Sequence, residues 1–402
     1  MRENVSLYLH IPFCQHRCSY CDFNTYAGMD HLRGAYVDAL CWEMNLVAEG
    51  AGLRLPIRTI FFGGGTPSLL SSEELRRILD QAREVFVVKT DAEISLEANP
   101  GTLTPDSLKA MHDLGINRIS MGMQSAHPDD LRLLERQHDF LDVVESVKWA
   151  RQAGFTNLSV DLIFGLPEQP LARWQDTLER ALDLGTEHLS LYALTLEHRT
   201  PFQHWTEKGL VPEADNDLAA DMYEYASERL ARAGLRQYEI SNWARIDAAR
   251  GLMACQHNLQ YWRNLPYIGI GAGAHGYIRG SRTANVLGIS AYIQRVESGR
   301  RFQFPQTPAT VNLTPIDRWT EMEETMMVGL RLTQEGVDRD VFERRFGRSM
   351  EAVFAEEISD CLGSGLVEWA GERSHRLRLT ERGHLLGNQV FMRFVGKETP
   401  GA

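Results

Sequence analysis

The first two-thirds of the chain alternates short apolar segments with longer amphipathic ones. The apolar segments are rich in Ile, Leu, Val and aromatic residues, as strands buried on both faces of a sheet are. We expect strands at residues 6–10, 58–62, 93–97, 117–121, 158–163 and 188–193. This alternation places the chain in the α/β class and predicts a parallel sheet with right-handed crossovers, either a barrel or a doubly wound sheet.

Helices are expected between these strands. Residues 71–86 begin with a capping box and place their apolar side chains on one face. Residues 104–114 and 139–153 each stop at a glycine, which is a typical helix end. A further amphipathic helix is expected through residues 219–230.

The pattern changes near residue 300. A Pro-rich linker is expected over 301–317, which separates a core over 1–300 from a smaller C-terminal domain over 318–402. The last segment reads as helices followed by a hairpin, with strands near 365–369 and 376–380, and is similar to a winged-helix domain. Its mixed charge favours packing or partner docking over DNA binding.

Composition narrows the class of protein. A net charge of −12 with no Lys/Arg-rich run argues against a nucleic-acid partner. The hydrophobic content of 43% and charged content of 24% are typical of a soluble globular protein. Neither a secretory signal nor an apolar run long enough to span a membrane is visible, and cysteines are sparse. We therefore expect a cytoplasmic protein in a reducing compartment.

Three cysteines follow the first expected strand in a C-x3-C-x2-C pattern, Cys14, Cys18 and Cys21. Thiolates at this spacing can wrap a loop around one soft metal centre. Three is one fewer than a closed zinc site or a fully ligated [4Fe–4S] cluster requires, so one iron of a cluster would stay free to bind another molecule. Zinc, with Cys41 or His16 as a fourth ligand, is the alternative, although no second cysteine pair supports it.

Other unusual residues gather where the expected strands end. These are Gly63–Pro67, Glu97–Pro100, Gly122–Ser125, Asp161 and Gly165–Pro167. Taken singly, each has a structural explanation as a turn or a buried acid. Because the carboxyl ends of parallel strands meet at one edge of a sheet, together they predict a site beside the cysteines.

A glycine pattern later in the chain imitates a dinucleotide-binding fingerprint. Gly271, Gly273 and Gly276 match G-x-G-x-x-G, and Glu297 follows about 20 residues on. That fingerprint requires a helix directly after the glycines, whereas a strand-like segment follows here. We interpret these residues as a glycine-rich strand close to a cofactor or to the sheet edge.

The cysteine triplet and the strand-end motifs together resemble the radical S-adenosylmethionine superfamily. Within it, the chain is similar to the branch that contains the oxygen-independent coproporphyrinogen III oxidases (HemN) and the heme chaperones (HemW), over nearly its whole length. The resemblance implies a partial (β/α)6 barrel with a smaller C-terminal winged-helix-like domain. It implies a [4Fe–4S] cluster on Cys14, Cys18 and Cys21, whose free iron chelates S-adenosylmethionine. The cofactor contacts that it implies are Tyr8, Tyr20, Gly64, Gly65, Thr66, Glu97, Gln124, Arg136 and Asp161.

Three departures from the oxidase pattern favour the heme chaperone branch. Phe23 stands where the oxidase has a fourth cysteine, and only 13 residues precede Cys14, whereas the oxidase carries a long N-terminal extension. Residues 257–262 match the H-N-x-x-Y-W motif of the chaperones. His257 is a candidate axial heme ligand, and Tyr261 and Trp262 are candidates for covering a porphyrin face. The alternative is a buried histidine hydrogen-bonded beside core aromatics.

Weaker heme-ligand candidates are His275 and Cys255. The resemblance implies a chaperone that binds heme and transfers it to apo-proteins such as respiratory enzymes at the membrane, where it would dock peripherally. Cluster and S-adenosylmethionine would then have a structural or regulatory role, with no catalytic residue assigned, and a homodimer stays open. The alternative is a true radical enzyme that converts coproporphyrinogen III to protoporphyrinogen IX through a 5′-deoxyadenosyl radical.

Overall fold

The computed structural model describes residues 5–198, 200–300 and 302–396 and contains two compact units. Unit 1 comprises Met1–Gly234 with Pro266–Thr314, and unit 2 comprises Leu235–Leu265 with Pro315–Ala402. This division differs from the expected domains in one segment, because residues 235–265 group with the C-terminal part of the chain. The expected linker also contains a strand, β15 (Thr310–Pro315).

Unit 1 is built on a parallel sheet whose first six strands all lie where the sequence predicts them. They are β1 (Val5–Ile11), β4 (Pro56–Gly64), β5 (Val87–Ala98), β6 (Arg118–Gln124), β7 (Leu158–Phe164) and β8 (His188–Ala193). Each strand pairs in parallel with the one before it in this series. A sheet wound in one direction is the arrangement of a partial (β/α)6 barrel, since a doubly wound sheet reverses its strand order.

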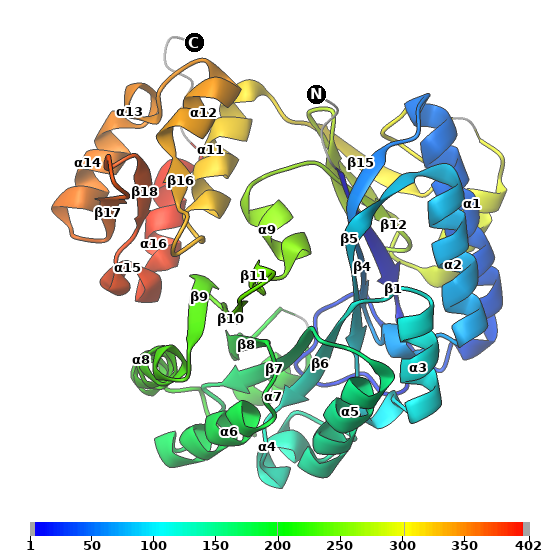
Figure 1. The fold of residues 1–402 in the computed structure, drawn as a ribbon, viewed down its shortest axis with the longest axis horizontal. Coiled ribbons are helices and arrows are strands. Elements are labelled where there is room, and N and C mark those ends of the chain that lie inside the picture. The colour runs from blue at the N-terminus through cyan, green and yellow to red at the C-terminus, as the bar shows by residue number, and fades with distance from the viewer. Residues whose placement is uncertain (1–4, 199, 301, 397–402) are drawn as a thin grey trace. The chain divides into compact units, whose positions relative to one another are not determined.

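Helices follow these strands, and most of them cover the outer face of the curved sheet (Figure 1). The helices are α1 (Arg33–Ala51), α2 (Ser72–Val85), α3 (Pro105–Asp113), α4 (Pro128–Leu133), α5 (Phe140–Ala153), α6 (Leu171–Asp183), α7 (Pro201–Glu207) and α8 (Asn216–Arg232). Capping boxes at Ser71, Thr104 and Asp139 begin α2, α3 and α5. Each satisfies two backbone N–H groups, so the chain itself defines where these helices begin. All four expected helices are confirmed.

The sheet continues on the other side of β1. β12 (Tyr267–Ile270) pairs with β1 in parallel, and β13 (His275–Ile278) and β14 (Ser281–Asn285) follow antiparallel, before α10 (Ile289–Glu297). Gly271 and Gly273 have φ of 107° and 76° and lie in the turn between β12 and β13. A strand therefore follows these glycines, and the resemblance to a dinucleotide fingerprint is only formal.

A buried carboxylate joins this extension to α1. Glu43 accepts hydrogen bonds from Gly271 N–H and Asn285 Nδ2 at 2.9 Å each, and from Tyr292 Oη and Thr307 Oγ1 at 2.7 Å each. These donors come from four places in residues 271–307, so one side chain fixes the position of a segment more than 200 residues away in sequence.

Unit 2 combines a three-stranded antiparallel meander with a small helical domain. The meander is β9 (Leu235–Glu239), β10 (Asn242–Asp247) and β11 (Gly251–Leu252), followed by α9 (Gln256–Trp262). The helices are α11 (Arg318–Gly329), α12 (Arg339–Phe346), α13 (Met350–Val353), α14 (Ala355–Gly363), α15 (Glu381–Leu385) and α16 (Gly387–Phe391).

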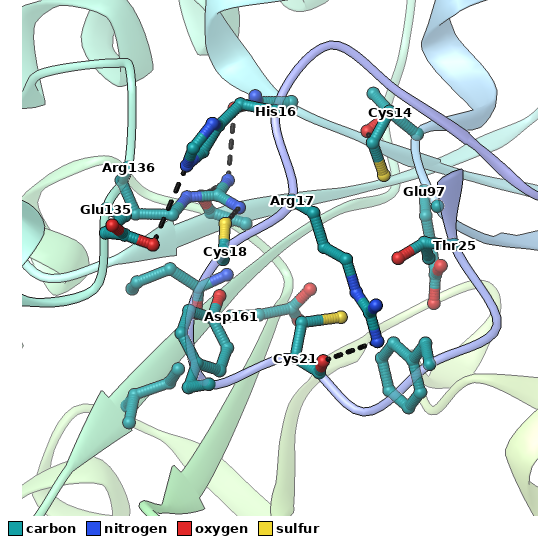
Figure 2. Close-up of a pocket in the computed structure, with 18 of the residues that line it drawn as sticks. Cys14, His16, Arg17, Cys18, Cys21, Thr25, Glu97, Glu135, Arg136 and Asp161 are labelled. Carbon is teal, nitrogen blue, oxygen red and sulfur yellow. Dashed lines mark hydrogen bonds and ion pairs between the residues drawn. The ribbon is translucent and has the colours of Figure 1, made fainter. Parts of the chain in front are cut away.

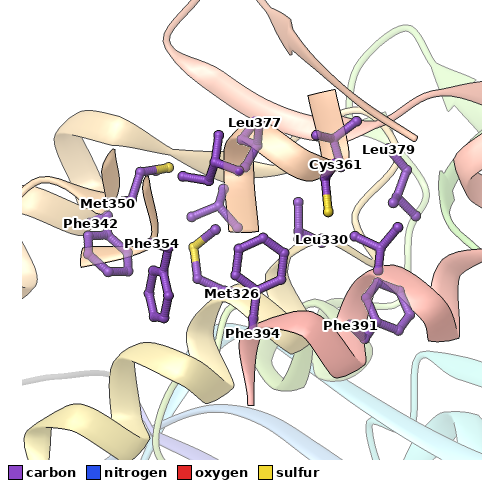
Figure 3. Close-up of a cluster of buried hydrophobic side chains, with 14 of the residues drawn as sticks. Met326, Leu330, Phe342, Met350, Phe354, Cys361, Leu377, Leu379, Phe391 and Phe394 are labelled. Carbon is purple, nitrogen blue, oxygen red and sulfur yellow. The ribbon is translucent and has the colours of Figure 1, made fainter. Parts of the chain in front are cut away.

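A short sheet of β16 (Val337–Asp338), β18 (Arg376–Leu379) and β17 (Val367–Ala370) completes this domain, so the expected hairpin is confirmed. Its core gathers Met326 and Phe342 from the helices, Leu330 and Phe354 from helix ends, and Leu377 from the hairpin (Figure 3). Along the described parts of both units, no helix has the length and apolar character that crossing a membrane requires.

Candidate functional site

A cavity of about 500 Å³ lies in unit 1 at the carboxyl ends of β4 to β8, and all three clustered cysteines line it. Eight of the nine expected cofactor contacts also line this cavity: Tyr20, Gly64, Gly65, Thr66, Glu97, Gln124, Arg136 and Asp161. The ninth, Tyr8, lies beside the lining, because a Cβ added to Gly63 would be 3.0 Å from the Tyr8 ring and 3.2 Å from Glu97 Oε2. The structure thus brings together residues that the sequence spreads over more than 150 positions.

The cysteines are carried on one loop, which Figure 2 shows in front of Glu97 and Asp161. Two short parallel strands, β2 (Phe13–Cys14) and β3 (Tyr26–Ala27), hold the ends of this loop together. Cys14 Sγ accepts a hydrogen bond from Thr66 Oγ1, and Cys18 Sγ accepts one from Arg136 Nη1, both at 3.7 Å. Donors aimed at sulfur stabilise the thiolate form, which is the form that binds a metal.

The donor set fits an iron–sulfur cluster. In the described part of the chain, no three His, Cys, Asp or Glu side chains surround one point closely enough to hold a single metal ion. A [4Fe–4S] cluster makes no such demand, because each cysteine binds a different iron and the sulfurs only have to line a common cavity. Burial raises the pKa of the Cys21 thiol to about 11, so its thiolate requires a cationic partner such as iron.

The two residues considered as a fourth zinc ligand lie in different places. His16 lines the cavity, where its Nε2 is 3.7 Å from Glu135 Oε2. Cys41 lies on α1, and its thiol contacts the Arg77 carbonyl oxygen at 3.9 Å.

Glycine is required where β4 ends against the cysteine loop. A Cβ on Gly65 would lie 2.6 Å from the Phe13 carbonyl oxygen and 3.0 Å from Cys14 Sγ. Gly64 has φ of 117°, and a Cβ there would lie 2.6 Å from the His10 ring. The sequence interpretation assigned these glycines to close approach of a cofactor. The structure shows that Gly65 first allows close approach of two backbone segments, whereas Gly64 leaves room for the His10 ring.

Two partly buried carboxylates line the cavity. Glu97 Oε2 accepts a hydrogen bond from Gly64 N–H at 3.1 Å, and both oxygens of Asp161 lie 3.2 Å from Ser120 Oγ. Burial, followed by repulsion from Asp161, raises the pKa of Glu97 to about 7, and burial raises the pKa of Asp161. A cavity floored by two carboxylates that resist ionisation favours a cationic ligand.

A guanidinium group from another element supplies the opposite charge. Besides Cys18, Arg136 donates from Nη2 to Asn99 Oδ1 and to the Gly122 carbonyl oxygen, both at 3.0 Å. Gln124, at the end of β6, has φ of 64°, an uncommon conformation for a residue with a side chain. With carboxylates from β5 and β7 and this guanidinium, the cavity suits a ligand that carries both an ammonium and a carboxylate.

Sequence reasoning missed several lining residues. Asn99 was included in a strand-end motif without a role of its own, and in the structure its side chain orients Arg136. Tyr192, at the end of β8, lines the cavity and is 43% exposed. Its position at a strand end was the one available signal. Phe23, noted as a replacement for a cysteine, is 62% exposed and also lines the cavity, so its ring stands at the solvent side of the site.

The H-N-x-x-Y-W motif forms helix α9 in unit 2. His257 is 1% exposed, and its Nε2 lies 2.9 Å from Tyr261 Oη, with the two rings edge to face. Trp262 packs against a local apolar cluster, and the Arg331 guanidinium lies 4.4 Å from its ring centroid. In this conformation the candidate ligand nitrogen is hydrogen-bonded to Tyr261, and one face of the Trp262 ring is covered.

The weaker candidates differ in exposure: His275 lies exposed on β13, and Cys255 is buried at the start of α9.

Two family models match the chain. The Radical SAM superfamily model matches residues 8–181, which contain the cysteine loop and the strands β4 to β7, whose ends line the cavity. The HemN C-terminal domain model matches residues 316–386.

Similar proteins cover nearly the whole chain. A heme chaperone HemW of Bacillus subtilis is 38% identical over 395 residues, covering 98% of this chain and 99% of the relative. A heme chaperone HemW of Escherichia coli is 40% identical over 280 residues, covering 68% of this chain and 70% of that protein. Among solved structures, coproporphyrinogen III oxidase (HemN) from Escherichia coli matches with a TM-score of 0.81 and 24% identity, covering 98% of this chain and 90% of the oxidase. The last match shows a shared fold.

Proposed function

Because the chain belongs to the heme chaperone HemW family, within the radical SAM superfamily, we propose that it binds heme and passes it to apo-proteins. The observation that carries this proposal is the 38% identity with the heme chaperone HemW of Bacillus subtilis, from one end of both chains to the other. The recipients that we propose are respiratory enzymes at the membrane, reached by peripheral docking of a cytoplasmic protein.

We propose that Cys14, Cys18 and Cys21 hold a [4Fe–4S] cluster and that the adjoining cavity takes S-adenosylmethionine. The partly buried carboxylates Glu97 and Asp161 suit the ammonium and the ribose hydroxyls, and Arg136 suits the carboxylate. A reduced cluster held by these cysteines would supply one-electron reducing chemistry to a ligand in the cavity.

The fold does not separate chaperone from oxidase, since a coproporphyrinogen III oxidase shares it. Phe23 supports the chaperone. Its apolar ring stands at the cavity where the oxidase pattern places a cysteine thiol, so it supplies contact area and no sulfur chemistry.

The expected result of a direct comparison is heme transfer without porphyrinogen oxidation. Cluster-reconstituted protein would be incubated anaerobically with reductant, S-adenosylmethionine and coproporphyrinogen III, with protoporphyrinogen measured by mass spectrometry. A second sample, loaded with heme, would be mixed with an apo-cytochrome, and transfer would be followed by absorption. Protoporphyrinogen above the rate of a Cys14→Ala control would make the protein an oxidase. Absence of both activities would contradict both proposals.

For heme itself, we propose that His257 is the axial ligand and that it becomes available when Tyr261 moves away. The Tyr261 hydroxyl competes with iron for Nε2, so Tyr261→Phe removes a hydrogen bond worth about 1 kcal/mol and should tighten heme binding roughly five-fold. His257→Ala should lose the axial band of the heme spectrum and weaken affinity. Titration of each variant with heme, followed by absorption, checks both outcomes, and replacement of the exposed His31 in His31→Ala is the control. An unchanged spectrum in His257→Ala removes this residue as a ligand.

A further inference from the structure

Below the two carboxylates, the inner face of the unit 1 sheet carries a second polar layer. The interior of a (β/α) barrel is ordinarily filled by bulky aliphatic side chains. Here Arg118 on β6, Ser159 on β7 and His188 on β8 are 2%, 0% and 0% exposed. Burying a charged side chain costs free energy unless an opposite charge or hydrogen bonds compensate, so the presence of Arg118 in this layer requires an explanation.

Strand register sets this layer directly beneath the cavity floor. Between β5 and β6, Ser95 is opposite Arg118 and Glu97 is opposite Ser120. Since side chains along a strand point alternately to opposite faces, Arg118 and Ser120 share a face, and Arg118 is one step farther from the cavity.

The same offset recurs between β7 and β8. Ser159 is opposite His188, and Asp161, two residues on, is opposite Ser190. Four strands, β5 to β8, therefore each contribute a polar side chain to the lower layer, because Ser95 belongs to it as well.

Hydrogen bonds connect the two layers. Ser159 Oγ lies 2.8 Å from His188 Nδ1 and 3.5 Å from Asp161 Oδ1, and Ser120 Oγ reaches Asp161 from β6. Burial, followed by the Arg118 charge, lowers the pKa of His188 well below its ordinary value, so this histidine is neutral at pH 7. Arg118 is then the permanent cation of the layer, because a guanidinium does not deprotonate in a protein.

We propose that Arg118 is a positioning residue for the cavity: its buried guanidinium, one layer below Glu97 and Asp161, favours the charged forms of these carboxyls, which face a cationic ligand. This inference rests on the proposed function in one respect, namely that the ligand is S-adenosylmethionine.

The effects of burial and of the Arg118 charge on the two carboxyl groups have opposite signs, which supports this role for Arg118. Burial raises the pKa of both carboxyl groups, and the Arg118 charge acts in the opposite direction on each of them. Without Arg118, both pKa values should rise further, the floor should hold protons at neutral pH, and attraction for a sulfonium or ammonium group should fall.

The test compares Arg118→Met with Arg118→Lys, which restores the charge, and with Ser95→Ala, which alters the same layer without altering charge. Affinity of the cluster-reconstituted full chain for S-adenosylmethionine would be measured calorimetrically from pH 6 to 9. Wild-type affinity should weaken as pH falls, with a midpoint near the Glu97 pKa of about 7. In Arg118→Met the midpoint should rise by about one pH unit and affinity at pH 7.5 should fall several-fold. Arg118→Lys should restore most of the wild-type midpoint and most of the affinity. Ser95→Ala should change neither the midpoint nor the affinity.

A second readout needs no S-adenosylmethionine. A carboxyl group whose folded pKa is raised stabilises the fold at low pH and loses that contribution as pH rises through the folded value. Other titratable groups that face the two carboxyls are His188 from β8 and Tyr8 from β1. The melting temperature of cluster-free Arg118→Met should therefore fall below wild type by a margin that grows from pH 6 to 9.

The affinity measurement tests the proposed cofactor, and the melting temperatures test the role of Arg118. If wild type binds no S-adenosylmethionine, the proposed cofactor is wrong, and the pH-dependent margin still decides the role of Arg118. A margin that stays constant with pH would show a purely structural role and overturn the inference.

Discussion

Replacing Cys18 with alanine is expected to abolish the iron–sulfur cluster, and with it binding of S-adenosylmethionine. Cys18 lies between the other two ligands on the loop, and the Arg136 guanidinium donates to its sulfur. With two thiolates left, a cube would have two irons without protein ligands, and the loop would gain no stability from holding it. Anaerobically reconstituted Cys18→Ala should contain little iron and sulfide and lack the visible absorption of the wild type.

Cys41→Ala is the matched control, because this thiol is half-buried on α1 and does not line the cavity. It should keep the iron, sulfide and absorption of wild type. Colourless wild-type protein that contains zinc and no sulfide would overturn the cluster assignment and restore zinc as the metal.

Replacing Glu43 with alanine is expected to destabilise unit 1 by about 3 kcal/mol or more, because each buried donor left without an acceptor costs about 1–3 kcal/mol. Four donors, from Gly271, Asn285, Tyr292 and Thr307, converge on this carboxylate. For a unit of this size, such a loss corresponds to roughly 6–12 °C in melting temperature. Thermal unfolding followed by circular dichroism measures it.

Glu49→Ala is the control, since Glu49 lies exposed on the same helix and should shift the midpoint little. A Glu43→Ala midpoint within 2 °C of the control would mean that water replaces the carboxylate as acceptor and that Glu43 is not essential to the extension.

The sequence predicted an element correctly where the residues that determine the element lie within one short segment. Ser71 and Glu74 form a capping box within four residues, and apolar runs define the six barrel strands. The gathering of strand-end motifs followed from one rule, that carboxyl ends of parallel strands share an edge. Residues from four of the five motifs line the cavity, whereas Gly165–Pro167 do not.

The division into compact units was less accessible from sequence. Residues 235–265 follow the barrel directly and carry no linker signal, yet they group with residues 315–402. Pairing inside unit 2 is the reason, as Arg331 stacks on Trp262 and Arg263 pairs with Glu335 at 2.7 Å. These contacts join residues about 70 positions apart, so they produce no pattern of hydrophobic and polar positions within either segment.

By itself, the sequence determined the α/β class, the order of its elements, the cysteine loop and the family. Each of these depends on neighbours in the chain or on short motifs of fixed spacing. Only the tertiary structure decided that Asn99 orients Arg136, that His257 is bonded to Tyr261, and that Arg118 lies under the cavity floor. Those facts depend on strand register and burial, which bring distant residues within hydrogen-bonding distance and change the energy of a charge according to what surrounds it.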